Sequence, residues 1–454
     1  MSFPAYPAYK SSGVEWLGEV PEHWAVVALK WLSPVFRGAS PRPIDDPIYF
    51  DDDGEFGWVR IADVTASPDG YLYETTQRLS ALGSSLSVKL EPGELFLSIA
   101  GSVGKPCITA VKACIHDGFV YFPWLSIDQR LLYRVFESGL CFGGLGKMGT
   151  QLNLNTDTVG GICIAVPPAA ELSLTLAFLD HETARIDALI AEQQRLIELL
   201  KEKRQAVISH AVTKGLDPNV PLKNSDVEWL GEVPGHWTVC KLNFRYTVEL
   251  GKMLDEKRNV GISPLQYLRN QDVQWGVVNI EALPLMDIGP DEYERYTVRY
   301  GDLLVCEGGD VGRAAMWRHS NIRIGYQKAL HRLRSQSPDS DTAEFFFYAL
   351  MAAKTLGVFE ESDTKATISH LPAEKFRQYR FAFPPLGEQK KIADFLGNEY
   401  SNVLSASVEA ETLISLLQER RSALISAAVT GKIDVRGWQP PASASSPESA
   451  QEAV

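Results

Sequence analysis

The sequence lacks the features that mark membrane and secreted proteins. No run approaches the ~18 consecutive apolar residues of a membrane span, and the opening MSFPAYPAYK has neither the basic nor the apolar part of a secretory signal. Cysteine is scarce, with six in 454 residues, and no C-x-x-C pair or zinc-type Cys and His spacing occurs. We expect unpaired thiols in a reducing cytoplasm, no membrane contact and no bound metal.

Positive charge is also scarce. The chain has 44 Lys and Arg against 57 Asp and Glu, a formal net charge of −13. A free-standing nucleic-acid binder usually shows a basic footprint. Binding to nucleic acid therefore requires local segregation of the positive charge, or a partner that supplies it.

The motifs of common enzymes are missing as well. GGLGKMG contains G-x-G-x-x-G at Gly144, Gly146 and Gly149, but Met148 stands where a Walker loop needs Ser or Thr. The stretch that follows, TQLNLNTDTV, is polar and typical of a loop rather than a helix. H-E-x-x-H, G-x-S-x-G and the N-P-P-Y or D-P-P-Y of amino-methyltransferases do not occur. We therefore expect no catalytic residues.

What the sequence does contain is an internal duplication. VEWLGEVPEHW at residues 14–24 returns as VEWLGEVPGHW at 227–237, with ten of eleven positions identical. PGELFLSIAGSVGKP resembles YGDLLVCEGGDVGRA, a Pro-Pro pair occurs twice, and LKEKRQAVISHAVTKGLD resembles LQERRSALISAAVTGKID. The offset drifts between 208 and 217 residues, as loop insertions and deletions would produce. The chain therefore consists of two copies of one unit, each of about 215 residues.

Each copy contains a strand-rich part followed by a long helix. Residues 25–166 and 238–383 hold short β-type runs such as GELFLSIA and GDLLVCE. After each Pro-Pro pair, the apolar period changes to about 3.5 residues with charged flanks, which is typical of a coiled-coil helix. We expect Asp180 or Thr183 to cap the first helix and Gly215 to end it. About 32 residues at 1.5 Å each would give a rod of roughly 48 Å.

Such a helix needs a partner, because an apolar seam is unstable alone in water. The second helix is the expected partner, and the alternative is that each helix packs on its own strand-rich part. Ile190 and Ile197 form a stripe beside the expected seam. The expected helix-pairing residues are Ile186, Leu189, Leu196, Leu200 and Val207 in the first helix and Leu413, Leu417 and Leu424 in the second.

The repeated VEWLGEVP segment follows the first helix and precedes the second strand-rich part. Its first copy precedes the first strand-rich part, so joining the two termini would make the sequence circular and approximately two-fold symmetric. Its tryptophans are Trp16, Trp24, Trp229 and Trp237. We expect them to pack a joint between helix end and strand-rich part rather than to contact a ligand.

A glycine turn followed by a cation also recurs. Gly101-Ser-Val-Gly104 with Lys105 corresponds to Gly309-Asp-Val-Gly312 with Arg313. Glycine permits close backbone approach and the cation can meet a phosphate, although hairpins also use glycine for purely structural reasons. In the second copy RAAMWRHSNIRIGYQKALHRLR continues the basic pattern without an acidic residue, interleaved with an aromatic Trp and Tyr, and suggests an anion-facing surface.

Arginine recurs at two other matched positions, in RIADV and RNQDV. Arg60 and Arg269 can read guanine, and Asn270 and Gln271 can read adenine; equally, the two arginines can form salt bridges with the Asp three residues on. The candidate DNA-binding residues are Arg60, Ser102, Lys105, Lys147, Gln151, Arg269, Asn270, Gln271, Arg313, Arg323, Lys328 and Lys365.

Taken together, the sequence resembles the DNA-specificity (S) subunit of a type I restriction–modification system. SGVEWLGEVPEHW with its repeat, GDLLVCEGGDVGRAAMW, the PPLGEQKKIADFL phrase and FLDHETARIDALIAEQQRLIELLKEKRQAVISHAVTKGLD carry the resemblance over about 430 residues. One departure is PPAAELSLTLAFLD in the first copy, which lacks the Glu-Gln-basic run of PPLGEQKK. We expect it to alter packing or a partner contact at the first helix start without changing the fold.

The resemblance implies an α+β protein with two strand-rich, mixed α/β target-recognition domains separated by two long antiparallel coiled-coil helices in a pseudo-two-fold, circular arrangement. The expected divisions are 1–170 (joint segment and first recognition domain), 171–215 (central helix), 216–385 (joint segment and second recognition domain), 386–436 (C-terminal helix) and 437–454 (disordered tail).

The resemblance also implies a non-catalytic subunit that binds double-stranded DNA. Each recognition domain would read half of a split, non-palindromic site, because the two domains differ in sequence. Two methyltransferase subunits would dock on the helices and two restriction–translocase subunits would join for cleavage; S-adenosylmethionine, ATP and Mg²⁺ belong to those partners. The alternative is a tandem-repeat coiled-coil scaffold that does not recognise DNA.

Overall fold

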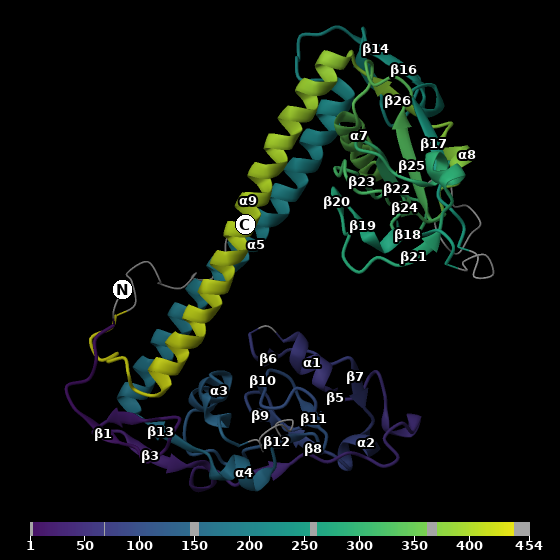
Figure 1. Ribbon diagram of the computed structural model, residues 1–454. Helices are drawn as coiled ribbons and strands as arrows, with labels where there is room; N and C mark the ends of the chain where they lie inside the picture. The colour runs from purple at the N-terminus through teal and green to yellow at the C-terminus, as the bar shows by residue number, and fades with distance from the viewer. Residues whose placement is uncertain (1–2, 68, 146–153, 255–260, 361–369, 440–454) are drawn as a thin grey trace, which may run out of the picture. The chain divides into compact units, whose positions relative to one another are not determined.

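The computed structural model describes residues 3–67, 69–145, 154–254, 261–360 and 370–439. They form two compact units, one of residues 1–192 and 413–454 (unit 1) and one of residues 193–412 (unit 2). The long helices α5 (Ala169–Lys214) and α9 (Leu386–Val429) each contribute to both units (Figure 1). The expected class, mixed α/β domains with two long helices packed together, is confirmed.

Unit 1 begins with the repeated joint segment and continues into two small sheets. The strands of the joint are β1 (Tyr9–Ser11) and β2 (Glu19–Pro21), which pair, and β3 (Ala25–Ala28), which pairs with β13 (Cys163–Val166). One sheet has the order β4 (Phe36–Arg37), β12 (Phe119–Tyr121), β9 (Leu95–Ser98), β10 (Pro106–Thr109), β6 (Tyr71–Leu72). The other has the order β7 (Gln77–Leu79), β5 (Phe56–Val59), β11 (Ala113–Ile115), β8 (Val88–Leu90). The short helices are α1 (Ile61–Ala66), α2 (Ala81–Ser85), α3 (Gln129–Glu137) and α4 (Thr156–Gly161).

Unit 2 has a joint of the same kind, but its sheets differ from those of unit 1 in the number and length of their strands. Its joint consists of β14 (Leu222–Asn224) paired with β15 (Glu232–Pro234), and β16 (Thr238–Lys241) paired with β26 (Arg380–Phe383). The sheets have the orders β17 (Tyr246–Leu250), β25 (Leu330–Ser335), β22 (Leu303–Cys306), β23 (Ala314–Met316), and β21 (Leu285–Asp287), β18 (Pro264–Leu268), β24 (Gly325–Tyr326), with β19 (Val273–Gln274) paired to β20 (Val277–Val278). The helices are α6 (Tyr293–Tyr296), α7 (Ala343–Thr355) and α8 (Ala373–Phe376).

Each domain is entered and left through one pair of adjacent strands. Ala25 lies opposite Val166 in unit 1, and Thr238 lies opposite Phe383 in unit 2. The strand that leaves the domain reaches its Pro-Pro pair and the long helix within a few residues. Because proline fixes φ and is tolerated at the start of a helix, this pair marks the change from strand to helix.

The long helices differ from the expected ones at their ends. α5 begins at Ala169, so Asp180 and Thr183 lie inside the helix and do not cap it; the Thr183 hydroxyl donates to the carbonyl of Leu179 at 2.7 Å. Gly215 follows the last residue of α5 with φ of 78°, the left-handed conformation that ends many helices. α9 ends at Val429, earlier than the expected 436, because the chain turns at Gly431 (φ 72°).

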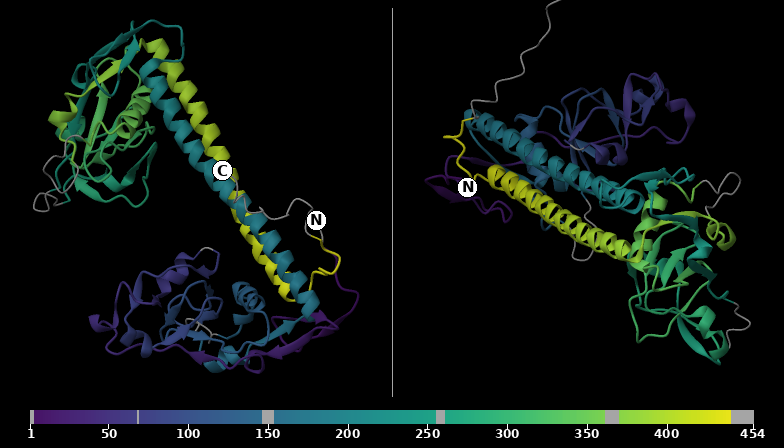
Figure 2. Two further views of the ribbon diagram at one scale, coloured as in Figure 1. Left: turned by 180° about the vertical axis from the view of Figure 1, so that it is seen from behind. Right: turned by 90° about the horizontal axis from the view of Figure 1, so that it is seen from above.

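α5 and α9 lie side by side in each unit (Figure 2). In unit 2, the Arg204 guanidinium lies 5.3 Å from the ring centroid of Tyr400, and Gly215 lies against Glu388, so α9 runs antiparallel to α5. The side chains buried along the two helices include Ile186, Ile197, Ile208, Ala211 and Val212 on α5 and Ile392, Leu396, Val403, Ala410, Leu417 and Leu424 on α9. Successive members of the α9 set are seven residues apart from Val403 onward, as a coiled-coil seam requires.

The expected seam is partly wrong. Ile186, Leu417 and Leu424 are buried, and Leu200 and Val207 are half-buried. By contrast Leu189, Leu196 and Leu413 are 39%, 41% and 43% exposed. On α5 the stripe through Ile190 and Ile197, one residue further along, faces the neighbouring helix instead. Both stripes have the same period, so the period alone does not decide which one is buried.

The tryptophans of the joint are packed as expected. Trp24 and Trp237 are each 1% exposed, and Trp16 and Trp229 are half-buried against the two main cores. Burial raises the pKa of the Cys107 thiol to about 12 and that of Cys114 to about 11, so both remain protonated, unreactive core residues. None of the described helices is both long and apolar enough to cross a membrane.

Candidate nucleic-acid interface

In unit 2, hydrogen bonds join the glycine turn to the segment that follows β18 and begins with Arg269. Gly309 and Gly312 have φ of 71° and 84°, and a Cβ on Gly312 would come within 2.5 Å of the Phe359 ring. The Asn270 side-chain amide donates to the carbonyl of Gly308 at 2.8 Å, and Arg313 Nη2 donates to the carbonyl of Asn270 at 3.1 Å. The structure therefore brings Asn270 and Arg313 together beside the turn.

Unit 1 has the same arrangement with fewer side-chain contacts. Gly101 and Gly104 have φ of 68° and 84°, and Gly101 packs against Ile61, the residue that follows Arg60. Lys105 Nζ donates to the carbonyl of Thr65 in α1 at 3.3 Å. Ser102 is exposed at the tip of the turn, where its carbonyl accepts a hydrogen bond from the Ser98 hydroxyl. In both units the turn, its trailing cation and the arginine segment form one face.

The two matched arginines differ in what their guanidinium groups contact. In both units the backbone N–H of the arginine donates to the Asp three residues on, at 2.8 Å. Arg269 Nε and Nη2 also donate to the two carboxylate oxygens of Asp272 at 2.8 Å each, which raises the pKa of Arg269. Arg60 is exposed and lines a cleft with Asp45, Asp51 and Asp52. The salt-bridge alternative therefore holds for Arg269, and for Arg60 the contact with Asp63 is through the backbone.

The basic run of unit 2 does not form one anion-facing surface. Arg332 is 3% exposed and its Nη2 pairs with Glu249 at 2.6 Å, while Arg334 pairs with Asp302 through Nε and Nη2 at 2.7 and 2.6 Å. Trp317 and Tyr326 are fully buried and present no ring for stacking. Arg332 and Arg334 share one face of β25, because side chains two apart on a strand point the same way, and that face is covered by the carboxylates of Glu249 on β17 and of Asp302, which precedes β22.

Of the remaining cations of the basic run, Lys328 lies beside the glycine turn and Arg323 does not. Lys328 is exposed in the residues between β24 and β25, and its charge acts on Glu307 at the start of the glycine turn. Burial raises the pKa of Glu307, whose carboxylate lies 3.2 Å from His370 Nε2. Arg323 is exposed with its guanidinium 4.5 Å from the Tyr293 ring centroid. Gln271 is exposed next to Asn270, and the candidates Lys147, Gln151 and Lys365 lie outside the described residues.

Two functional carboxylates were missed by the sequence reasoning. Glu388 accepts hydrogen bonds from Trp237 Nε1 at 3.1 Å and His236 Nε2 at 2.7 Å. Glu171 accepts from Trp24 Nε1 at 2.9 Å and lies 2.8 Å from His23 Nε2. The signal was present, because both glutamates stand three residues after the second proline of the pair.

The departure noted in PPAAELSL is therefore smaller than expected: it retains the glutamate and lacks the glutamine. Gln389 accepts from the Thr342 N–H at 2.9 Å and donates to the carbonyl of Pro384 at 2.9 Å, so it ties the start of α7 to the start of α9. Leu172 stands at its place in unit 1.

Comparison with known proteins relates this chain to one protein family. Residues 268–407 match the family model "Type I restriction modification DNA specificity domain". The chain is 24% identical over 302 residues to the type I restriction enzyme EcoKI specificity subunit of Escherichia coli K12, covering 63% of this chain and 62% of that subunit. It is 21% identical over 394 residues to the StySPI specificity subunit of Salmonella potsdam, covering 83% and 81%.

Solved structures share the fold at low identity. A chain reported under "Structural basis underlying complex assembly and conformational transition of the type I R-M system" aligns with a TM-score of 0.70 and 16% identity, over 91% of this chain and 99% of that one. The HsdS subunit from Thermoanaerobacter tengcongensis aligns with a TM-score of 0.54 and 15% identity, over 91% and 98%.

The duplicated domains and the paired long helices give this chain the fold of the solved S subunits, and residues 268–407 match the DNA specificity domain of the type I restriction–modification systems. Its sequence is similar to those of specificity (S) subunits, the non-catalytic members of these systems, in agreement with the resemblance found in the sequence. The chain spans about 62% of the length of the EcoKI subunit that it matches.

Proposed function

We propose that each unit reads one half of a split, non-palindromic site on double-stranded DNA through its glycine-turn face. The observation that carries this proposal is the pattern of matched positions around the turn. Cations recur at two of them, Arg60 with Arg269 and Lys105 with Arg313. The contacts around the turn place Asn270 at the position of Ile61, and Gln271 at that of Ala62.

Lys328, like Asn270 and Gln271, has a counterpart of a different residue type in unit 1. The N–H of Ile99 donates to the carbonyl of Gly118, and the N–H of Glu307 donates to that of Ala329, so Asp117 stands where unit 2 has Lys328. Asp117 is held by Arg42 at 3.0 Å. Recurring cations suit the phosphate backbone, which is the same in both half-sites, whereas side chains that differ suit bases that differ. This reasoning assigns phosphate contact to Arg60 and Lys105 and base reading to Asn270, Gln271 and Lys328.

The exposed leucines of the helices support a partner present in two copies. Leu196 and Leu199 on α5 are 41% and 47% exposed, and their repeat counterparts Leu413 and Leu416 on α9 are 43% and 56% exposed. An apolar pair that recurs at matched positions suits two copies of one protein. We infer that these are two methyltransferase subunits, joined for cleavage by two restriction–translocase subunits. S-adenosylmethionine, ATP and Mg²⁺ would belong to these partners, which would also supply the positive surface that a chain of net charge −13 lacks.

The test is a genome-wide map of methylated adenines in the host with the gene intact, deleted in frame, or carrying Asn270→Ala and Gln271→Ala. Deletion should remove one split, non-palindromic motif. The double variant should relax or change one half of that motif and leave the other, since a base contact is worth about 1–3 kcal/mol of discrimination. A map unchanged by deletion, with this chain and a methyltransferase subunit both expressed, would contradict the proposal.

A further inference from the structure

The two units differ at the junction between the domain helix and the long helix. In unit 1, Arg134 on α3 pairs with Asp180 on α5 at 2.8 Å and with Glu137 at 2.8 Å. Arg421 on α9 pairs with the same Glu137 at 2.9 Å and with Asp187 on α5 at 2.8 Å. Guanidinium groups of the chain itself therefore fill the space between α3 and the long helices.

Matched positions in unit 2 lack these ion pairs. The side-chain caps Asp128 and Thr342 align α3 with α7, and the two Pro-Pro pairs align α5 with α9. The replacements are Glu344 for Arg130, Tyr348 for Arg134, Met351 for Glu137, Gly397 for Asp180 and Leu404 for Asp187. Arg204, the counterpart of Arg421, is retained, but both of its acidic partners are gone and it lies over the ring of Tyr400.

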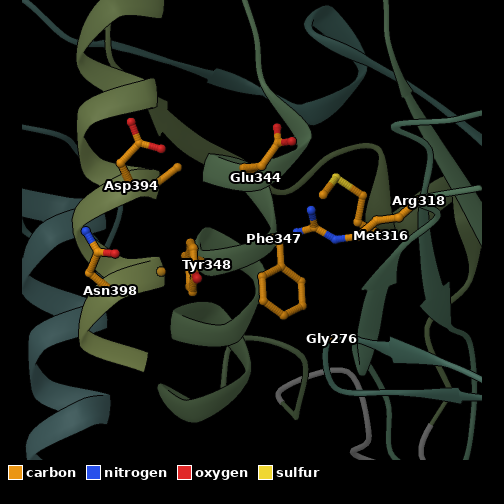
Figure 3. A pocket seen from close by; sticks show the side chains of 10 residues that line it. Gly276, Met316, Arg318, Glu344, Phe347, Tyr348, Asp394 and Asn398 are labelled. Atoms are coloured by element: carbon orange, nitrogen blue, oxygen red, sulfur yellow. The ribbon is translucent and has the colours of Figure 1, made fainter. Parts of the chain in front are cut away.

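An open cleft of about 400 Å³ lies where unit 1 has its ion pairs. Figure 3 shows Asp394 and Asn398 reaching from α9, Glu344, Phe347 and Tyr348 from α7, and Arg318 from the opposite wall. A Cβ on Gly397 would lie 3.8 Å from the Tyr348 hydroxyl, so this glycine leaves the room that the Asp180 carboxylate takes up in unit 1.

The carboxylates of the cleft are free to accept a cation. Glu344 is half-buried and Asp394 is exposed. Within the described part of the chain neither forms an ion pair, with Arg318 or with any other cation. In Figure 3 both carboxylates lie toward one end of the cleft, and the rings of Phe347 and Tyr348 lie toward the other end. A cleft lined by both carboxylates and aromatic rings suits a planar guanidinium, which pairs with a carboxylate in a bidentate manner and stacks on ring faces.

We propose that this cleft receives an arginine side chain from a methyltransferase subunit, placed where Arg134 lies in unit 1. The inference rests on the proposed function, since it takes the methyltransferase as the partner. Unit 1 supplies its own guanidinium at the matched junction and offers no carboxylate there to a partner. The two methyltransferase copies are therefore held unequally, and the copy on unit 2 has one anchor more.

The first test removes the negative charge of the cleft. The full chain is titrated with the methyltransferase subunit of the same host, and native mass spectrometry counts the copies bound. Glu344→Gln with Asp394→Asn should weaken one of the two binding steps by about tenfold, the loss expected for about 1.4 kcal/mol, and leave the other unchanged. Glu374→Gln, an exposed acid on α8 outside the cleft, is the matched control and should leave both steps unchanged.

The second test fills the cleft with an ion pair between side chains of this chain. Tyr348→Arg with Gly397→Asp installs the ion pair that unit 1 uses, and should keep the melting temperature at or above that of the unaltered chain while weakening the same binding step. If both double variants bind each of the two copies as tightly as the unaltered chain does, the inference is wrong and the proposed function still stands. Failure of the unaltered chain to bind any methyltransferase would overturn both.

Discussion

At the scale of single residues, the best-defined feature is the carboxylate at the start of each long helix. Glu171 is 6% exposed in the first turn of α5, where it receives hydrogen bonds from Tyr6, His23 and Trp24. Glu388 repeats the contact with His236 and Trp237. The positive end of a helix dipole favours a carboxylate at this place. The His-Trp dipeptide therefore recurs because each copy needs two donors to tie its joint to its helix.

This contact predicts a pH dependence of stability. Burial alone would raise the pKa of Glu171, but hydrogen bonds from Tyr6, His23 and Trp24 outweigh it and lower that pKa. A lowered pKa means that the stabilisation is complete above the ordinary glutamate pKa and is lost as the pH falls through the lower, folded-state value. We expect Glu171→Gln to cost about 1.5–3 kcal/mol at neutral pH, the range for hydrogen bonds to a charged group, and less in acid.

Thermal unfolding of the full chain between about pH 6 and pH 3 measures this difference. The melting temperature of the unaltered chain should fall toward that of Glu171→Gln as the pH decreases. Glu192→Gln, an exposed position on the same helix, is the control and should follow the unaltered chain throughout. Curves for Glu171→Gln and the unaltered chain that stay parallel over the whole range would contradict the assigned role.

Also at the scale of single residues, the sequence was a good guide to which residues lie together and a poor guide to the groups that they contact. The glycine turn, its cation and the arginine segment do share one face, because their repetition in order marked them as a set. The interpretation of Arg332 and Arg334 failed, because their partners Glu249 and Asp302 lie 83 and 32 residues away along the chain. A run of positive charge along a sequence carries no information on acidic groups that other strands bring beside it.

At the scale of elements, the period of the long helices could be predicted but their buried face could not. Leucines and isoleucines occupy two adjacent stripes of α5, and the side on which α9 packs decides which stripe is buried. Ile197 is 9% exposed and its neighbour Leu196 is 41% exposed. Substitutions at these two neighbouring residues can therefore distinguish loss of helix packing from loss of the proposed partner binding.

We expect the two positions to respond in opposite order in two assays. Ile197→Ala should cost about 2–4 kcal/mol of stability, as for other buried large-to-small changes, because it opens a cavity between α5 and α9. Leu196→Ala with Leu199→Ala should cost less than about 1 kcal/mol and should weaken methyltransferase binding, which Ile197→Ala affects only through unfolding. Denaturation followed by circular dichroism and a pull-down with the methyltransferase subunit measure the two effects. If both variants lose the same stability and bind equally, the assigned faces of α5 are wrong.

At the scale of the whole molecule, the duplication was readable from the sequence because four segments recur in order. The difference between the two copies was not readable, since it depends on which side chains meet across each junction. Arg134 and Asp180 are 46 residues apart and pair, whereas Tyr348 and Gly397 at the matched positions leave a cleft. A duplicated chain can thus keep one backbone plan while the side chains at matched positions differ between the two copies.

This division of labour makes the exchange of one domain the decisive test. The strands β16 and β26 pair with Thr238 opposite Phe383, so residues 238–383 leave the rest of the chain through two adjacent strand ends. Replacing this segment with the corresponding segment of a related S subunit keeps the joint, with Glu388 and His236, and both long helices. Methyltransferase binding through the exposed leucines of the helices should therefore persist, whereas the contribution of the cleft should persist only if the donor segment has a carboxylate at the position of Glu344. One half of the methylated motif should change to that of the donor, and the other half should stay, because the first recognition domain is untouched. A map of methylated adenines in which both halves change would show that the domains do not read their half-sites independently.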